Sequence, residues 1–407
     1  MKNLIKNKNY MYLLYGYTFS VLVDAIILMI CLKVVEELSN DTGSYTFLYM
    51  MHYLPAVLFS LWIGAWINSK KLEKVMVISL IVRTTMLLAF IFAKGLNNLP
   101  FVYAFIFIES FISVFFLPST DTMIPKIVHK DQRLIANGFI KLMYVLMQGI
   151  GFGISTILIK MNISLVVILS ICVIALLVAL VSIHKINRQY KIEAQNQNVV
   201  KEMFDTLHYL RKNKLSYKVF ILFAIAWLIA SSIDLIVISY LTNTSKVSSE
   251  NFGIVSIVVF MGMIVGSLFS SHIYEKIDIK YIFSFPLFIY SITVLSMYFL
   301  HQWTYTLPFF FLGGLSLGFF EVCFTTFLQD YNDEKYYTRI FSLQNMILSS
   351  MPLPGLLFLG VFIEWGGIKL TLIIVSSLLL AVSICAYLIN YNQPYNNKVK
   401  NSRNELK

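Results

Sequence analysis

The chain alternates long runs of apolar residues with short polar segments along its whole length. A bilayer core about 30 Å thick needs roughly 20 apolar residues per helix, and we assign twelve runs to such helices. The predicted spans lie at 10–35, 45–67, 74–93, 98–118, 138–159, 163–183, 218–241, 252–273, 281–300, 304–328, 340–363 and 368–390. The pattern therefore predicts an all-α membrane protein with about twelve transmembrane helices.

One polar connection is longer than the others and separates the first six runs from the last six. Apolar residues recur in it at helical spacing, at Val199, Met203, Leu207 and Leu210. We expect an amphipathic helix here, lying either on the anionic inner leaflet or in solvent as a linker helix. The predicted organisation is a six-helix half (1–183), this cytoplasmic linker (184–217), a second six-helix half (218–391) and a polar cytoplasmic tail (392–407).

The two predicted halves begin in a similar way. Lys-Asn-Tyr at 8–10 opens the first span, and Asn-Lys followed by a Tyr within 213–217 opens the seventh. An acidic residue then occurs inside each of these spans, Asp24 in the first and Asp234 in the seventh. Two pseudo-symmetric six-helix halves joined by a long loop are typical of transporters that rock around a central site.

Composition agrees with a membrane protein, and the placement of charge predicts its orientation. Of the residues, 58% are hydrophobic and 13% charged, which is too little charge to cover a soluble surface. With both termini in the cytoplasm, 25 of the 32 Lys and Arg residues fall on cytoplasmic segments. The positive-inside rule therefore predicts a multi-pass protein of a bacterial-type inner or plasma membrane with both termini cytoplasmic. The same placement explains the net charge of +11, so nucleic acid is not an expected partner.

Six Asp, Glu, Lys or Arg residues lie at least three positions from either end of a predicted span: Asp24, Arg83, Glu109, Lys141, Asp234 and Glu321. A charge at the bilayer centre costs at least about 2.5–3.5 kcal/mol, so it persists only with a partner, a cavity or a function. We interpret the four acids as candidates for proton coupling or substrate binding, and the two bases as structural charge partners. The alternative is an inert ion pair, such as Asp24–Arg83 or Glu109–Lys141.

Two spans contain residues that bend helices or bring them close together. Pro352-Leu353-Pro354-Gly355 interrupts span eleven, and Gly313, Gly314 and Gly318 lie in span ten. Such residues serve either as a hinge or for tight packing in membrane helices, and both readings stay open here.

Several short segments occur in the order and spacing of a known transporter family. They are Asn9-Tyr10 with Asp24, the stretch 117–125 followed by Ala136-Asn137, the stretch 207–213, and 325–329 followed by 339–341. With these segments the chain resembles the major facilitator superfamily over essentially its whole length. It is most similar to the branch of macrolide-efflux-type and siderophore-exporting proteins. The resemblance implies that spans one, four, seven and ten line a central cavity.

The resemblance also implies a loop motif, usually Gly-x-x-x-Asp-Arg, which this chain carries in altered form. The corresponding residues are Gly64, Asn68, Lys70 and Lys71 between spans two and three, and Glu275 and Lys276 between spans eight and nine. In the first copy Asn replaces the acid and the Arg is missing, whereas the second copy keeps an acid–base pair. In span five, Phe152 stands where proton antiporters of the family have the Pro of a Gly-Pro pair.

The chain has no metal-ligand spacing, Walker sequence or Gly-rich phosphate loop, so neither a cofactor nor direct use of ATP is expected. It also lacks the catalytic His or Asp group that a membrane-embedded enzyme would need. We predict a monomeric secondary active transporter, surrounded by membrane lipids, which exports a small organic molecule by alternating access in exchange for protons. That molecule is a drug, a macrolide-like compound, or a siderophore or metallophore. An importer of a small solute on the same fold is the first alternative, and a membrane enzyme or a receptor is the next.

Overall fold

The structure is a computed structural model, and every regular element in the part of the chain that it describes is helical. That part comprises Leu4 and residues 6–39, 41–68, 70–92, 97–129, 132–186, 199–274, 276–332 and 337–389. The surroundings of some residues within these ranges also lie outside the description, among them Gly64 and Asn68.

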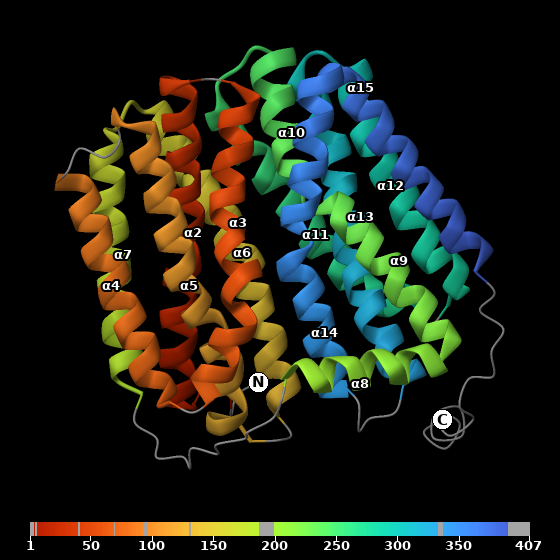
Figure 1. Cartoon of the computed structure of the whole chain (residues 1–407), viewed down its shortest axis with the longest axis horizontal. Helices are drawn as coiled ribbons and strands as arrows, with labels where there is room; N and C mark the ends of the chain where they lie inside the picture. Colours follow the sequence, from red (N-terminus) through yellow and green to blue (C-terminus); the bar gives the residue numbers. More distant parts are fainter. Residues whose placement is uncertain are drawn as a thin grey trace. The chain divides into compact units, whose positions relative to one another are not determined.

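The first six spans form six helices (Figure 1). They are α2 (Lys8–Leu38), α3 (Thr42–Asn68), α4 (Leu72–Phe92), α5 (Leu99–Ile127), α6 (Arg133–Lys160) and α7 (Leu165–His184). Five of them match the predicted spans to within a few residues. The exception is α5, which continues to Ile127 although the apolar run was expected to end at 118. A helix has no reason to end where the apolar run does, because its backbone hydrogen bonds continue into the interface.

The remaining spans are more irregular. Their helices are α9 (Lys214–Ala230), α10 (Ile233–Ser239), α11 (Phe252–Tyr274), α12 (Ile279–Phe299), α13 (Trp303–Tyr331), α14 (Tyr337–Ser350) and α15 (Pro352–Leu388). Span seven is broken between α9 and α10 and ends in a π-helical turn, Tyr240–Thr244. Span eleven is broken between α14 and α15, as the proline-rich segment predicts.

Within α15 the backbone leaves helical geometry at Gly367, where φ is 72° and ψ is 172°. Glycine adopts a positive φ at little steric cost, and this residue separates spans eleven and twelve. Ten helical stretches of the described chain are long and apolar enough to cross a bilayer. One of these, Met346–Leu388, contains the break at Gly367, and the apolar helix α3 adds a further crossing. The described chain thus agrees with twelve spans.

The two halves begin with the same capping arrangement. The side chain of Asn7 caps α2, and its Nδ2 donates to the carbonyl of Ile127 at the end of α5, at 2.8 Å. The side chain of Asn213 caps α9, and its Nδ2 donates to the carbonyl of Tyr331 at the end of α13, at 2.7 Å. Each asparagine thereby joins the start of span one or seven to the end of span four or ten. The sequence similarity between the two starts reflects this repeated contact.

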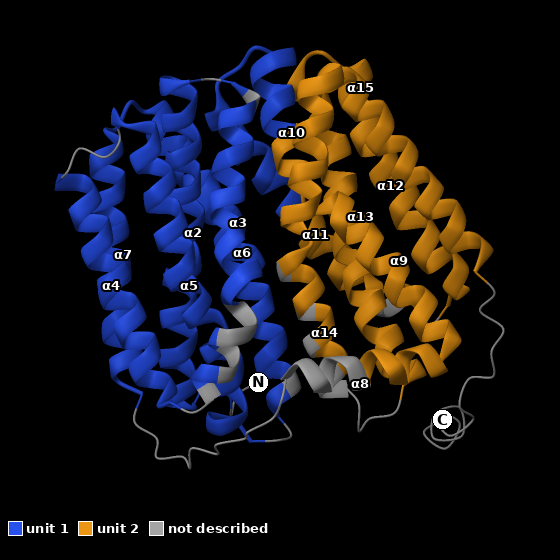
Figure 2. Ribbon diagram, in the orientation of Figure 1, with its two compact units in different colours: residues 1–196, 237–260 blue, residues 197–236, 261–407 orange. Residues whose placement is uncertain are grey.

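The contacts divide the chain into two compact units, coloured separately in Figure 2. Unit 1 is Met1–Asn196 with Val237–Phe260, and unit 2 is Gln197–Ile236 with Met261–Lys407. The end of span seven and the first part of span eight therefore group with the first six helices. The predicted division of the sequence at 184–217 stays a prediction.

In unit 1, α2 packs against α5, α6 and α7, and α4 packs against α5 and α7. Where α2 meets α6, Gly151 lies directly against the α2 backbone. A Cβ at this position would meet the carbonyl oxygen of Leu22 at 2.9 Å and the Cβ of Ala25 at 2.7 Å. The small residue lets the two helices approach closely, as is common in membrane bundles.

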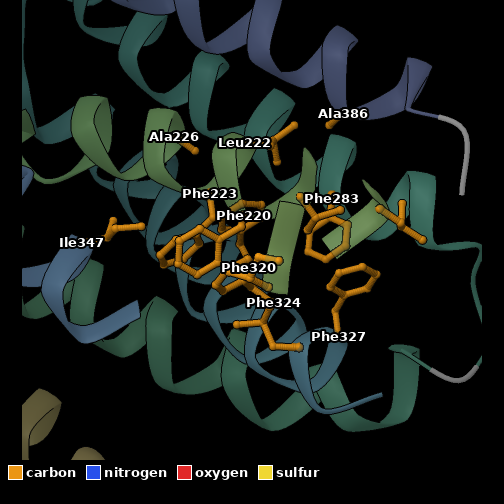
Figure 3. Close-up of a cluster of buried hydrophobic side chains, with 14 of the residues drawn as sticks. Phe220, Leu222, Phe223, Ala226, Phe283, Phe320, Phe324, Phe327, Ile347 and Ala386 are labelled. Atoms are coloured by element: carbon orange, nitrogen blue, oxygen red, sulfur yellow. The ribbon is translucent and has the colours of Figure 1, made fainter. Parts of the chain in front are cut away.

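In unit 2, aromatic side chains from α9, α12 and α13 fill a buried cluster (Figure 3). Phe223 of α9 stacks on Phe324 of α13 with ring centroids 3.8 Å apart. Phe283 of α12 meets Phe327 of α13 edge to face at 5.5 Å. These contacts fix three helices of the unit against one another, because aromatic pairs add directional energy to packing.

The predicted linker helix is present as α8 (Val199–Lys212). Leu210 is fully buried in the aromatic cluster of unit 2, and Leu207 packs against the same cluster. The side chains of 199–205 lie outside the described residues. Leu207 and Leu210 pack against protein and not against lipid. Their contacts therefore favour a linker helix over an amphipathic helix on the inner leaflet.

Two glycines of span ten, Gly313 and Gly318, serve close packing. A Cβ at Gly318 of α13 would meet the backbone of Met263 in α11 at 2.8 Å, and one at Gly313 would meet Thr293 of α12 at 2.8 Å. Helix α13 is continuous from Trp303 to Tyr331. We therefore assign the close-packing reading to these glycines.

Candidate functional site

Arg83 of α4 lies inside unit 1 with no exposed surface. Its Nε donates to Oε1 of Glu109 at 2.6 Å, and its Nη1 donates to Oγ of Ser20 at 2.6 Å. Its Nη2 forms an ion pair with Asp24. Two helices, α2 and α5, therefore bring polar side chains to a guanidinium on α4, whose planar fork suits several acceptors at once. We call these four residues the Arg83 cluster.

The Arg83 cluster contains two carboxylates and one cation. Among the described residues, Asp24 and Glu109 form salt bridges to Arg83 alone. With both acids ionised, the cluster carries one net negative charge in a low-dielectric interior, which is costly. The side chain of Asp24 is 17% exposed and that of Glu109 is 5% exposed, so Asp24 is the more accessible acid. The arrangement is suited to take up one proton or one cation at Asp24.

Lys141 is not the partner of Glu109, so that suggested ion pair is wrong. The Glu109 carboxylate is occupied by Arg83, whereas Lys141 of α6 is exposed and interacts electrostatically with Asp121 of α5. The spacing of residues within each helix could not show which of two bases faces Glu109, because that depends on the neighbouring helix. Asp121 was not among the predicted site residues, because the predicted span four ended at residue 118.

Asp234, the candidate of unit 2, lies in the first turn of α10, directly after the break in span seven. It is half-buried, and the described part of the chain gives it neither a salt bridge nor a hydrogen bond. The buried hydroxyl of Tyr290 on α12 interacts electrostatically with it and has no hydrogen-bond partner there. Asp24 and Asp234 therefore differ, because the first is neutralised by an arginine and the second is not.

The breaks in spans seven and eleven meet each other. The hydroxyl of Ser232 donates to the carbonyl of Pro352 at 3.3 Å, and Gly355 packs against Ser232 and Leu228. One turn away, Nε1 of Trp227 donates to the carbonyl of Leu348 at 3.3 Å. The Trp227 indole thereby pairs a carbonyl that has no helical donor, because residue 352, four positions after Leu348, is a proline without an N–H.

The Arg83 cluster does not include the other predicted site residues. Glu321 is half-buried on α13 of unit 2. In the loop motif, Lys70, Lys71 and Lys276 are exposed, and Nζ of Lys70 lies 5.4 Å from the ring centroid of Trp66. Glu275 and the side chain of Asn68 lie outside the described residues, and so do the surroundings of Gly64. Among the described residues no group of three His, Cys, Asp or Glu side chains is arranged to hold a metal.

A second polar cluster joins the ends of α2 and α6 to the short helix Ser249–Asn251 in unit 1. The carboxylate of Glu36 accepts hydrogen bonds from Nζ of Lys33 at 2.9 Å and from the backbone N–H and the hydroxyl of Ser249 at 3.0 and 2.7 Å. Lys33 also forms a salt bridge with Glu250 at 3.4 Å, and Lys160 donates to Asn251 at 2.7 Å. We call this set the Glu36 cluster. It ties the start of span eight to spans one and five.

Replacing Glu36 by alanine is expected to loosen this junction. Loss of the carboxylate leaves the Ser249 N–H and Lys33 without their main acceptor, at a cost of about 1.5–3 kcal/mol. The apparent melting temperature of the purified protein in detergent should fall by several degrees. The neighbouring Glu37 is exposed, so Glu37→Ala is the matched control and should leave the melting temperature unchanged. Equal values for the two variants would show that the Glu36 cluster contributes nothing to stability.

The sequence profile of the Major Facilitator Superfamily matches residues 12–242 and 219–406, which together span almost the whole chain. The chain belongs to this superfamily. As a superfamily member it is a secondary transporter of a small molecule and a multi-pass membrane protein, which agrees with the helical structure. The family assignment points to transport and away from catalysis.

Solved structures support the same fold. One is a bacterial homolog of the human lysosomal transporter Spinster, in an inward-facing and unoccupied conformation, with a TM-score of 0.72 and 11% identity, covering 93% of this chain and 96% of that chain. Another is the nucleoside transporter NupG, with a TM-score of 0.71 and 14% identity, covering 94% of this chain and 100% of that chain. At these identities the similarity establishes the fold alone. A search of the curated proteins found no match.

Proposed function

We propose that this superfamily member exports a small organic molecule in exchange for protons, by alternating access. The observation that carries the proposal is the Arg83 cluster, in which two buried acids share one cation inside the spans. The resemblance to macrolide-efflux-type and siderophore-exporting proteins supports export, and it suggests a macrolide-like compound or another drug, or a siderophore, as the cargo.

The Arg83 cluster suggests how a proton could be carried. Protonation of Asp24 removes its negative charge and weakens its attraction to Nη2 of Arg83, while Glu109 and Ser20 keep their bonds to the guanidinium. The cluster then becomes electrically neutral, so its burial costs less. Release of the proton restores the pair. A change in the surroundings of Asp24 during transport would thus be coupled to the binding or release of one proton.

Asp234 is the corresponding candidate in unit 2. Because it has neither a salt bridge nor a hydrogen bond in the described structure, its protonation state depends on water or substrate that reaches it. We propose that Asp234 contacts either the substrate or the proton, and that Glu321 is a further candidate on α13.

Transport in everted vesicles tests the proposal. Vesicles that contain the protein are acidified inside by respiration, and the release of an acridine dye reports proton efflux when a macrolide, a hydroxamate siderophore or a nucleoside is added. We expect the macrolide or the siderophore to release the dye, and vesicles with the Asp24→Asn variant to give no release. Labelled compound that accumulates in everted vesicles indicates export. A response to the nucleoside alone, with uptake in right-side-out vesicles, would favour the importer alternative.

The orientation of the chain is a separate prediction. Because 25 of the 32 basic residues fall on one side, we expect both termini in the cytoplasm of a bacterial-type cell. Reporter fusions after Lys212 and after Lys407 should be active in the cytoplasm, and a fusion at Ser245 should be active outside. A cytoplasmic signal from the Ser245 fusion would contradict the assigned topology of the second half.

A further inference from the structure

Spans seven and eight each pass from one compact unit into the other. Unit 1 contains residues 237–260, which are the end of span seven and the start of span eight, and unit 2 contains the rest of both spans. Transporters built from two related halves work by rocking one half against the other. During such a motion, either 237–260 separate from the first six spans, or spans seven and eight bend where they leave unit 1.

The structure of α11 favours separation over bending in span eight. The helix runs without interruption over Phe252–Tyr274 and contains no proline. Within unit 2 it is packed closely against α13, since a Cβ at Gly262 would meet the backbone nitrogen of Leu315 at 2.8 Å and one at Gly266 would meet its Cα at 3.0 Å. Span seven, by contrast, is already broken at 231–232. The contacts that have to open are therefore those between the start of α11 and the first six spans.

The start of α11 meets α6 along a row of glycines. A Cβ at Gly149 of α6 would lie 3.2 Å from the Cβ of Phe260, and one at Gly153 would lie 3.0 Å from Cγ1 of Ile257. At both places a glycine of α6 faces an apolar side chain of α11. We call this contact the glycine seam. Apolar contacts are non-directional, so the seam opens without leaving a buried polar group unpaired.

The Glu36 cluster adds hydrogen bonds between the same parts of unit 1. Oγ1 of Thr156 on α6 donates to the carbonyl of Glu250 at 2.7 Å, and Nζ of Lys33 on α2 donates to Oγ of Ser248 at 2.8 Å. The side chains of Lys33, Glu36 and Glu250 are only 17%, 15% and 19% exposed. All of these bonds break together if the start of span eight separates from spans one and five. Water then takes their place, which keeps the net cost moderate.

The Glu36 cluster lies at one end of its helices. Lys33 and Glu36 are near the end of α2, Lys160 is the last residue of α6, and the partner residues 248–251 directly precede α11. In the predicted topology, with the N-terminus in the cytoplasm, these ends are on the outer side of the membrane. A closure made here therefore blocks the outer side.

We propose that the Glu36 cluster and the glycine seam form a latch, which closes the transport path on the outer side and opens once in each transport cycle. Glu36 is its central residue, because its carboxylate accepts bonds from Lys33, Ser248 and Ser249. The assignment rests on the proposed alternating access and names the contacts that separate during it.

The first test of the latch needs no substrate. Thr156 is 1% exposed and packs against Gly253 of α11, so a cysteine at 156 reports whether the seam is open. Thr156→Cys is made in a Cys385→Ser background, which removes the exposed cysteine. Right-side-out vesicles are treated with a charged, membrane-impermeant thiol reagent. Glu36→Ala should raise the labelling rate at least about tenfold, since it removes several hydrogen bonds to a charged group. Glu37→Ala is the matched control and should leave the rate unchanged.

The buried Cys31 and Cys172 of unit 1 remain in this background and detect general unfolding. They should stay unlabelled while position 156 reacts. Equal labelling rates at 156 with and without the Glu36 carboxylate would overturn the proposal. Labelling of all three positions together would also overturn it, because Glu36 would then stabilise the whole unit and not a latch.

The second test locks the latch with a disulfide. Gly149→Cys with Phe260→Cys places two Cβ atoms 3.2 Å apart across the seam, near the separation that a disulfide requires. Gly313→Cys with Thr293→Cys is the matched control, because its Cβ atoms are also 3.2 Å apart but both residues belong to unit 2. Oxidation should abolish flux of the compound that releases the dye in the first pair, and a reductant should restore it. The control pair should keep its flux.

Mass spectrometry of the free thiols measures how completely each disulfide has formed. Undiminished flux with the 149–260 disulfide complete would overturn the latch, and so would an equal loss in both pairs. If none of the compounds is transported, the proposed export function fails, whereas the labelling test still decides whether the Glu36 cluster is a latch.

Discussion

Replacing Arg83 by methionine is expected to remove most of the folded protein from the membrane. Methionine has a similar length, but it leaves Asp24 and Glu109 as two buried acids without a cation. Breaking a buried ion pair by removing one partner typically costs about 3–5 kcal/mol, which is a large share of a protein's total stability. The amount of protein that remains monodisperse after extraction in mild detergent should fall at least tenfold.

A compensated variant separates charge from packing. Adding Asp24→Asn and Glu109→Gln to Arg83→Met removes all three charges at similar volume, so abundance should recover substantially. Lys141→Met is the matched control, because Lys141 is the other base that we interpreted as a structural charge partner and makes no salt bridge in the described structure. It should leave abundance near that of the parent protein. If Arg83→Met and Lys141→Met are equally abundant, the Arg83 cluster is not a structural requirement.

Neutralising the acids singly is expected to abolish gradient-driven transport while the protein stays in the membrane. Asp24→Asn leaves Arg83 with Glu109 and Ser20 as acceptors, so the cation is not stranded. Asp234→Asn removes no salt bridge or hydrogen bond that the structure describes. Both variants keep the size of the side chain and lose the proton that it carries. Proton-driven flux in everted vesicles should fall to background in each.

The control for this pair is Asp278→Asn, since Asp278 is an exposed acid between spans eight and nine. It should pump at the parental rate. Abundance, measured on the same membranes, distinguishes the two explanations of lost flux. Low abundance of Asp24→Asn would indicate a purely structural ion pair, and parental flux in both variants would remove both acids from the mechanism.

Much of the fold was predictable because the bilayer restricts what a chain can do. Backbone groups in lipid must be hydrogen-bonded within the segment, so an apolar run of sufficient length becomes a helix. The predicted ends near 35, 67 and 93 agree with α2, α3 and α4 to within a few residues. Proline in span eleven likewise predicted a break, because a ring nitrogen cannot continue the helical hydrogen bonds.

The ends and interruptions of other helices were less predictable. Helix α5 runs past the apolar segment to Ile127. It ends at Ile127, whose carbonyl accepts a hydrogen bond from Nδ2 of Asn7, the N-cap residue of α2. This contact joins distant parts of the chain. The break at 231–232 in span seven contains no proline or glycine, and Ser232 instead bonds to Pro352 of span eleven. Such features depend on the neighbouring helix.

The sequence by itself determined that this chain is a twelve-span membrane protein with buried acids, since hydropathy and charge are properties of single segments. Only the tertiary structure decided which charges meet. It joined Glu109 to Arg83 and left Lys141 beside Asp121, a residue that the predicted spans had excluded. The physical reason is that helical periodicity fixes which residues share a face, whereas the packing of helices fixes what that face touches.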